Sequence, residues 1–192
     1  MQNHSEYSGK YDNFTPDITI DGIEGDKLIT RYLSLEKISD EAFKDMVEYF
    51  EKADEKTIIV FFGDHQPSDY VVEPVWNLAG KKGSDLSFSE MIDRYRVPFI
   101  IWANYDIEEA SGVEISANFL GNLTLKAAGV PLDPYRSFLE DFSKKYPVLS
   151  SIHVTDAQGN DSSVDEMSAG GNLKDYEKMQ YYELFDDKDN YE

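Results

Sequence analysis

The fold is decided by one stretch, TIIVFFGDHQP, at residues 57–67. Its first six residues are β-branched or aromatic and uncharged, a pattern that predicts a strand buried on both faces, as in the centre of a parallel sheet. Gly63 ends this strand, and Asp64 and His65 follow directly. Ligands of open α/β sheets bind beyond the carboxyl ends of strands, and carboxylate and imidazole groups bind divalent metals. Asp64 and His65 are therefore a candidate metal site, although Asp64 capping a turn beside an ordinary loop histidine explains the pattern equally well.

Hydrophobic periodicity outside this stretch predicts helices that alternate with strands. Residues 26–50 form one long helix, or two helices with a break near 37–39 where Ser39 could act as a cap. The remaining predicted helices cover 69–78, 87–95, 115–128, 135–146 and 173–185, and the remaining predicted strands cover 98–103 and 148–155. This order is typical of a layered α/β domain. We expect His153, inside the last predicted strand at the sheet edge, to have a structural role.

The length of 192 residues predicts one domain over residues 1–192 with a real hydrophobic core. Residues 5–25 are rich in Ser, Gly, Asp, Asn and Pro and are expected to form a long loop. The acidic tail at 186–192 is expected to fray.

The net charge of −20 at pH 7 argues against nucleic acid as a partner, because the phosphate backbone would be repelled. The chain has no cysteine, so disulfides are excluded. No apolar run reaches the length of a signal peptide or a membrane span, and we expect a soluble chain.

The motif VFFGDHQP at residues 60–67 resembles the late metal-binding motif of sulfatase-like enzymes of the alkaline phosphatase superfamily. The resemblance is to the lipoteichoic acid synthase and phosphoglycerol transferase group in particular. MQNH at 1–4 resembles the strand end that presents a substrate-binding histidine in that group. Residues 98–105 and 116–121 resemble its later core strand and helix, so the likeness covers nearly the whole chain.

This resemblance implies an alkaline phosphatase-like fold, with helices packed on a mostly parallel central sheet, of which the chain holds the C-terminal half. It implies that Asp64 and His65 bind a divalent metal ion. Mn²⁺ is the favoured ion, and Mg²⁺, Zn²⁺ or Ca²⁺ are the alternatives. It also implies that His4 contacts substrate. In the family a Thr nucleophile lies on an earlier strand, before the position that His4 resembles. We therefore expect no catalytic nucleophile in this chain, weak or absent metal binding, and no activity when it is alone.

The implied parent is a membrane-anchored phosphoglycerol transferase with an extracellular catalytic domain, acting on a glycerophospholipid head group. Two alternatives stay open: a hydrolase of phosphate or sulfate esters from the same superfamily, and a non-catalytic binding or structural module. An incomplete sheet would expose an apolar edge, which predicts either a homodimer through that edge or shielding by the first 25 residues.

Overall fold

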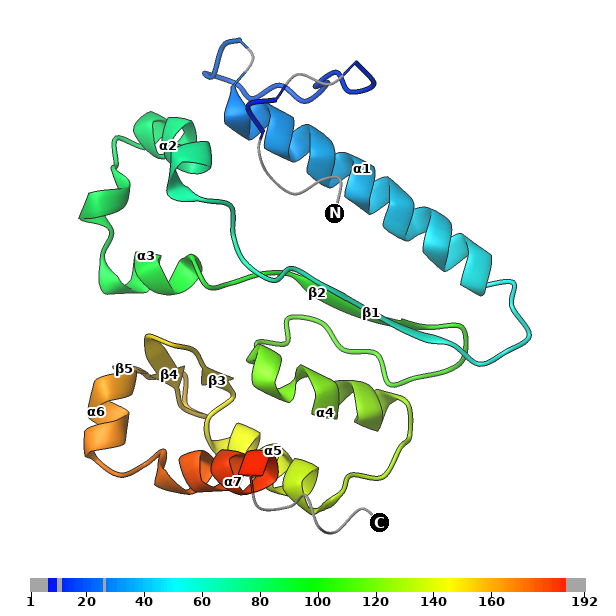
Figure 1. The fold of residues 1–192 in the computed structure, drawn as a ribbon, viewed down its shortest axis with the longest axis vertical. Coiled ribbons are helices and arrows are strands. Elements are labelled where there is room, and N and C mark those ends of the chain that lie inside the picture. The colour runs from blue at the N-terminus through cyan, green and yellow to red at the C-terminus, as the bar shows by residue number, and fades with distance from the viewer. Residues whose placement is uncertain (1–6, 10–11, 26, 186–192) are drawn as a thin grey trace. The chain divides into compact units, whose positions relative to one another are not determined.

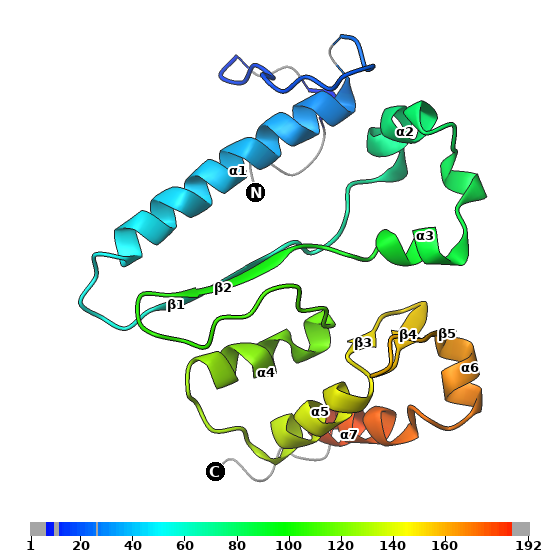
Figure 2. The same cartoon turned by 180° about the vertical axis from the view of Figure 1, so that it is seen from behind.

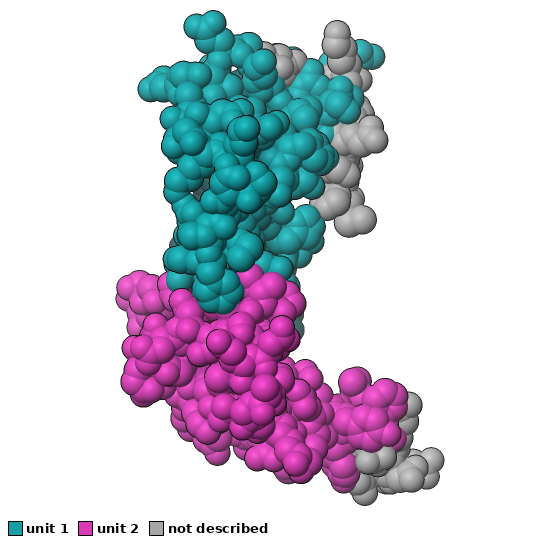
Figure 3. All heavy atoms as spheres, turned by 90° about the vertical axis from the view of Figure 1, so that its left-hand side faces the viewer, with its two compact units in different colours: residues 1–105 teal, residues 106–192 magenta. Residues whose placement is uncertain are grey.

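The computed structural model describes residues 7–9, 12–25 and 27–185. Its internal contacts divide the chain into two compact units, residues 1–105 and 106–192, which Figure 3 shows in different colours. That residues 1–192 form one partial domain stays a prediction. Among the described residues, no helix combines the length and the apolar character needed to cross a membrane.

The described part of the first unit combines a long helix with a two-stranded sheet and short helical segments (Figure 1). Its elements in chain order are α1 (Leu28–Phe50), β1 (Ile58–Phe62), α2 (Asp69–Leu78), η1 (Gly83–Asp85), α3 (Phe88–Asp93) and β2 (Phe99–Ala103). Helix α1 is continuous, so the alternative of two helices is wrong. Ser39 does not cap a helix, because its hydroxyl donates to the Leu35 carbonyl one turn earlier, at 3.1 Å.

Strands β1 and β2 pair antiparallel, with Ile58 opposite Ala103 and Phe62 opposite Phe99. The α/β class is confirmed. The pairing of these two strands is antiparallel, whereas the sequence predicted a mostly parallel central sheet. Figure 2 shows the physical reason: residues 63–98 leave the sheet at the end of β1 and re-enter it at the same end. A strand that starts where its neighbour stops must run back along it. The apolar run at 57–62 carries no information on the direction of its partner.

The prediction that β1 is buried on both faces is also wrong for this chain. Phe61 stacks on Phe43 of α1 with ring centroids 4.5 Å apart, so helix α1 covers one part of the strand. Phe62 nevertheless remains 51% exposed, and Ile100 of β2 remains 47% exposed. The sheet thus presents uncovered apolar side chains, and the predicted homodimer through this sheet stays a prediction.

Asn104 joins helix α1 to the start of the sheet. Its side-chain oxygen accepts a hydrogen bond from the Thr57 backbone N–H at 2.8 Å. Its amide nitrogen lies 3.0, 3.2 and 2.9 Å from the carbonyl oxygens of Phe50, Ala53 and Glu55, to which it donates. One side chain therefore satisfies backbone groups along the whole connection between α1 and β1.

We expect Asn104→Ala to lower the free energy of unfolding by about 1–3 kcal/mol, because backbone groups lose their partner in a half-buried place. Asn104→Asp should also destabilise the fold, since it keeps the acceptor for Thr57 but places a second oxygen against three carbonyls. Urea unfolding measures both. Asn77→Ala, at an exposed position of α2, is the control and should change stability by less than about 0.5 kcal/mol. Equal stability of the Asn104→Ala and Asn77→Ala variants would contradict this account.

The described residues before α1 contain no regular helix or strand apart from an isolated bridge between Ile20 and Ile23, as expected for the long loop. Ser34 of α1 attaches this loop to the helix. Its hydroxyl is buried, accepts the backbone N–H groups of Asp17 and Ile18 at 3.1 Å each, and donates to the Thr30 carbonyl at 2.8 Å.

The described part of the second unit packs helices against a three-stranded antiparallel sheet of order β3-β4-β5. Its elements in chain order are α4 (Ala117–Ala127), α5 (Pro134–Lys145), β3 (Val148–Leu149), β4 (His153–Thr155), β5 (Asp161–Ser163), α6 (Val164–Ala169) and α7 (Lys174–Phe185). The predicted helices 115–128, 135–146 and 173–185 are confirmed with end shifts of one or two residues.

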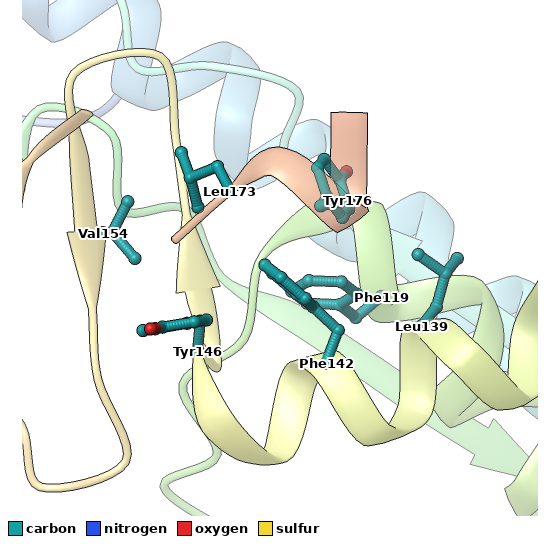
Figure 4. Packing of buried hydrophobic residues seen from close by; sticks show 7 residues of the cluster. All are labelled: Phe119, Leu139, Phe142, Tyr146, Val154, Leu173 and Tyr176. Carbon is teal, nitrogen blue, oxygen red and sulfur yellow. The ribbon is translucent and has the colours of Figure 1, made fainter. Parts of the chain in front are cut away.

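The core of the second unit is a cluster of aromatic and aliphatic side chains from α4, α5, the sheet and the last helical segment (Figure 4). Its members are Phe119, Leu139, Phe142, Tyr146, Val154, Leu173 and Tyr176. The ring of Phe142 lies 4.9 Å from that of Tyr176 and 5.3 Å from that of Tyr146, measured between centroids. Helices α5 and α7, distant in sequence, are thus joined through aromatic rings that pack at a tilt.

The predicted single strand at 148–155 is two strands separated by a turn. The Ser150 hydroxyl accepts the backbone N–H groups of Ile152 and His153 at 3.2 and 3.1 Å, which bends the chain between β3 and β4. His153 is 3% exposed, and its Nδ1 lies 2.7 Å from the Ser150 hydroxyl. It lies in the central strand of the sheet, so the prediction of an edge strand is wrong.

Candidate metal centre

The turn that follows β1 is held close to the segment that precedes β2. The Gly63 backbone N–H donates to the Pro98 carbonyl at 3.1 Å. A Cβ atom at position 63 would lie 3.1 Å from the Val97 Cβ, closer than such atoms normally approach. Glycine therefore allows the chain to turn here without displacing Val97.

Asp64 and His65 project from this turn with their metal-binding atoms facing each other. Oδ1 of Asp64 accepts the His65 backbone N–H at 2.9 Å, which fixes the carboxylate relative to the histidine backbone. Oδ2 of Asp64 lies 3.7 Å from Nε2 of His65. The side chains are 76% and 64% exposed, respectively, and are open to a ligand from solvent.

The other imidazole nitrogen of His65 fixes the tautomer. Nδ1 lies 2.9 Å from the Gln66 carbonyl oxygen. Since a carbonyl can only accept a hydrogen bond, Nδ1 carries the proton and donates it. The neutral ring then has its lone pair on Nε2, the atom that faces Asp64. A backbone carbonyl that holds one ring nitrogen in this way is a usual feature of metal-binding histidines.

The pair fits one side of a divalent metal site. Metal bonds of about 2.0–2.2 Å to a carboxylate oxygen and an imidazole nitrogen place the two donors of a tetrahedral site about 3.4 Å apart. The observed separation of 3.7 Å between Asp64 Oδ2 and His65 Nε2 is close to this value. Within the described ranges, no third His, Cys, Asp or Glu joins the pair. The other ligands of such an ion would be water or residues that these ranges do not contain.

His4, the predicted substrate contact, lies outside the described residues. The described residues that follow it are bound to helix α1: the Arg31 guanidinium donates to the carbonyls of Tyr7 and Gly9 at 2.9 and 2.7 Å. The Tyr7 ring packs edge to face on Tyr32, with centroids 5.5 Å apart. Burial, with a smaller contribution from the Glu36 carboxylate, raises the pKa of Tyr32 to about 12, so its hydroxyl stays protonated at neutral pH.

The sequence did not indicate the hydrogen bonds that attach the turn to the segment between α3 and β2. The Gln66 side-chain amide donates to the Arg96 carbonyl at 2.5 Å. Nη2 of Arg94 donates to the Pro67 carbonyl at 2.6 Å and to Oδ1 of Asp69 at 2.8 Å. These contacts join residues 25 to 30 positions apart, and no local pattern in the sequence indicates them.

The model of the Sulfatase family matches residues 1–130, more than half of the chain, including the strand, the turn and the Asp64–His65 pair. The chain therefore belongs to the sulfatase family, as the motif at 60–67 indicated.

Two other proteins are similar to the chain. The chain is 26% identical over 197 residues to a Rhizobium meliloti (strain 1021) protein whose name assigns it provisionally to cyclic beta-1,2-glucan modification, covering 96% of this chain and 30% of that protein. Its fold is similar to that of the Streptococcus pyogenes phosphoglycerol transferase GacH, solved with sn-glycerol-1-phosphate, at a TM-score of 0.55 and 22% identity. That likeness covers 77% of this chain and 36% of GacH. The chain thus spans about a third of the length of each relative.

Proposed function

We propose that this chain forms the metal-binding C-terminal part of the catalytic domain of a phosphoglycerol transferase of the lipoteichoic acid synthase type. The observation that carries the proposal is the Asp64–His65 pair at the carboxyl end of β1, with Oδ2 and Nε2 3.7 Å apart, in a chain of the sulfatase family. The fold likeness to GacH, whose solved structure contains sn-glycerol-1-phosphate, supports a phosphoglycerol group over a sulfate ester.

In this proposal Asp64 and His65 hold a divalent ion, and Mn²⁺ is the favoured candidate. When bound, the ion supplies positive charge that polarises a phosphoryl oxygen and lowers the pKa of a coordinated hydroxyl. The Asp64 carboxylate supplies one anionic ligand through Oδ2. The Gln66 carbonyl keeps the His65 proton on Nδ1, so that Nε2 can act as the second ligand. His4 would donate a hydrogen bond to a phosphoryl oxygen of the substrate.

The nucleophile and the remaining metal ligands would come from residues outside this chain. Catalytic groups that act as a unit lose nearly all activity when one member is missing. The proposal therefore includes that the isolated chain turns over no phosphodiester, while it keeps a weak two-ligand metal site.

Titration of the isolated chain with Mn²⁺ tests the metal site. We expect paramagnetic broadening of the His65 ring signals in NMR spectra, because a bound ion lies within bonding distance of Nε2. Asp64→Ala should shift the broadening to higher Mn²⁺ concentration, and addition of a chelator should reverse it. No effect of Asp64→Ala, or broadening that a chelator does not reverse, would argue against the proposed site.

A further inference from the structure

We infer that Arg94 is a positioning residue for the metal-binding turn, an inference that rests on the proposed metal site. Arg94 follows α3, and a single nitrogen of its guanidinium group, Nη2, donates to both the Pro67 carbonyl at 2.6 Å and the Asp69 carboxylate at 2.8 Å. Its guanidinium carbon lies 5.3 Å from the centroid of the Trp76 ring, a distance typical of a cation–π contact. The side chain is 23% exposed.

These contacts fasten the exit of the turn, whereas its entry is fastened separately. At the entry, the Gly63 N–H donates to the Pro98 carbonyl at 3.1 Å. At the exit, Arg94 holds the carbonyl of Pro67, a buried residue whose ring restricts its own backbone. Asp64 and His65 lie between these two anchor points. After loss of the Arg94 contacts, the hydrogen bond from the Gln66 side chain to the Arg96 carbonyl would still connect the turn to the segment before β2.

A fixed turn matters here because the described part of the chain supplies only two metal ligands. With few ligands, the free energy spent on ordering the turn is a large share of the binding free energy. Metal-binding side chains on an exposed turn need supporting contacts to keep their donors at bonding separation. Arg94 provides such support from α3, an element that contributes no metal ligand of its own.

Charge and position predict opposite results for Arg94, which makes the inference testable. Arg94 is a cation near the proposed site, so its removal would strengthen Mn²⁺ binding if only its charge mattered. If Arg94 acts by holding the turn, its removal weakens Mn²⁺ binding. Arg94→Lys separates the two effects further, because lysine keeps the charge but has no planar guanidinium group that lies over the Trp76 ring while Nη2 bonds to Pro67 and Asp69.

The experiment compares the full 192-residue chain with three variants, Arg94→Ala, Arg94→Lys and Arg96→Ala. Arg96→Ala is the matched control: it removes the same charge two residues away, and Nη1 of Arg96 lies 3.1 Å from Asp93 in α3. It also keeps the backbone carbonyl that accepts from Gln66. Mn²⁺ affinity is read from the broadening of the His65 ring signals, and amide exchange of Gly63 and Val71 reports on the order of the turn. Exchange of the β1–β2 amides shows that each variant is folded.

We expect Arg94→Ala and Arg94→Lys to weaken Mn²⁺ binding about tenfold, the lower end of the effect of contacts that support metal ligands. Both should speed amide exchange around the turn, and Arg96→Ala should do neither. Binding by Arg94→Ala that equals or exceeds that of the Arg96→Ala control would overturn the inference and leave the metal site intact. Absence of Mn²⁺ binding in the unmodified chain would overturn the proposed site and this inference together, so the two failures are distinguishable.

Discussion

Replacement of Phe119 by alanine is expected to lower the free energy of unfolding by about 3–5 kcal/mol, the usual range for a buried phenylalanine. Phe119 is 1% exposed in the core of the second unit. Its ring centroid lies 6.2 Å from that of Phe142 and 6.4 Å from that of Tyr176, so truncation leaves a cavity between three helices. A loss of this size is a large fraction of the stability of a typical domain.

Urea unfolding followed by the near-ultraviolet circular dichroism of the aromatic core measures this loss. Phe185→Ala is the control, because it removes the same ring from a position in α7 that is 59% exposed. The control should change stability by less than about 0.5 kcal/mol. Similar stability losses for the two variants would show that the cluster around Phe119 does not stabilise the second unit as described.

Asp64→Ala is expected to lower phosphoglycerol transfer about a thousandfold in an enzyme that unites this chain with the residues that supply the nucleophile. Metal stabilisation of transition-state charge contributes several kcal/mol, and each 1.36 kcal/mol corresponds to a factor of ten in rate. Removal of the proposed Oδ2 ligand leaves His65 as the single proposed ligand among the described residues. The assay follows the release of diacylglycerol, the leaving group of the transfer, from phosphatidylglycerol in the presence of Mn²⁺.

Asp85→Ala provides the matched control for that assay. Asp85 lies in η1, within the segment 63–98 that connects β1 to β2. Its carboxylate accepts a hydrogen bond from the neighbouring Ser84 hydroxyl. The substitution removes the same charge without removing a proposed ligand, so the rate should stay near that of the unmodified enzyme. Retention of more than about a tenth of the rate by Asp64→Ala would be incompatible with the proposed role.

The elements that could be predicted from the sequence are those set by local patterns. The apolar run before Gly63 indicated β1, and three- and four-residue periodicity indicated α1, α5 and α7. The Asp64–His65 pair could be found because its two residues are adjacent and directly follow a strand. Such signals depend on neighbours within one or two helical turns, which is the range that periodicity and capping report.

The remaining features depend on contacts between distant residues or on turns with weak signals. The antiparallel partner of β1, the role of Asn104 and the contacts of Arg94 all depend on residues about 25 to 54 positions apart. Helix α6 was missed although a signal was present: Ser163 and Glu166 form a capping box, with the Ser163 hydroxyl accepting the Glu166 N–H at 3.2 Å. The polar composition around Gly170 and Gly171 concealed it.

Residues 63–98 form a connection between β1 and β2 whose two ends lie side by side, so its length can change during evolution. Its two ends are held together by the strand pairing of Phe62 with Phe99 and by the hydrogen bond from the Gly63 N–H to the Pro98 carbonyl. For a segment with pinned ends, doubling the length costs only about 0.6 kcal/mol of closure entropy. We expect family members to differ in length between α2 and α3 while β1, β2 and the Asp-His turn keep their places. New surfaces beside the proposed metal site could then arise by insertion, without a new fold.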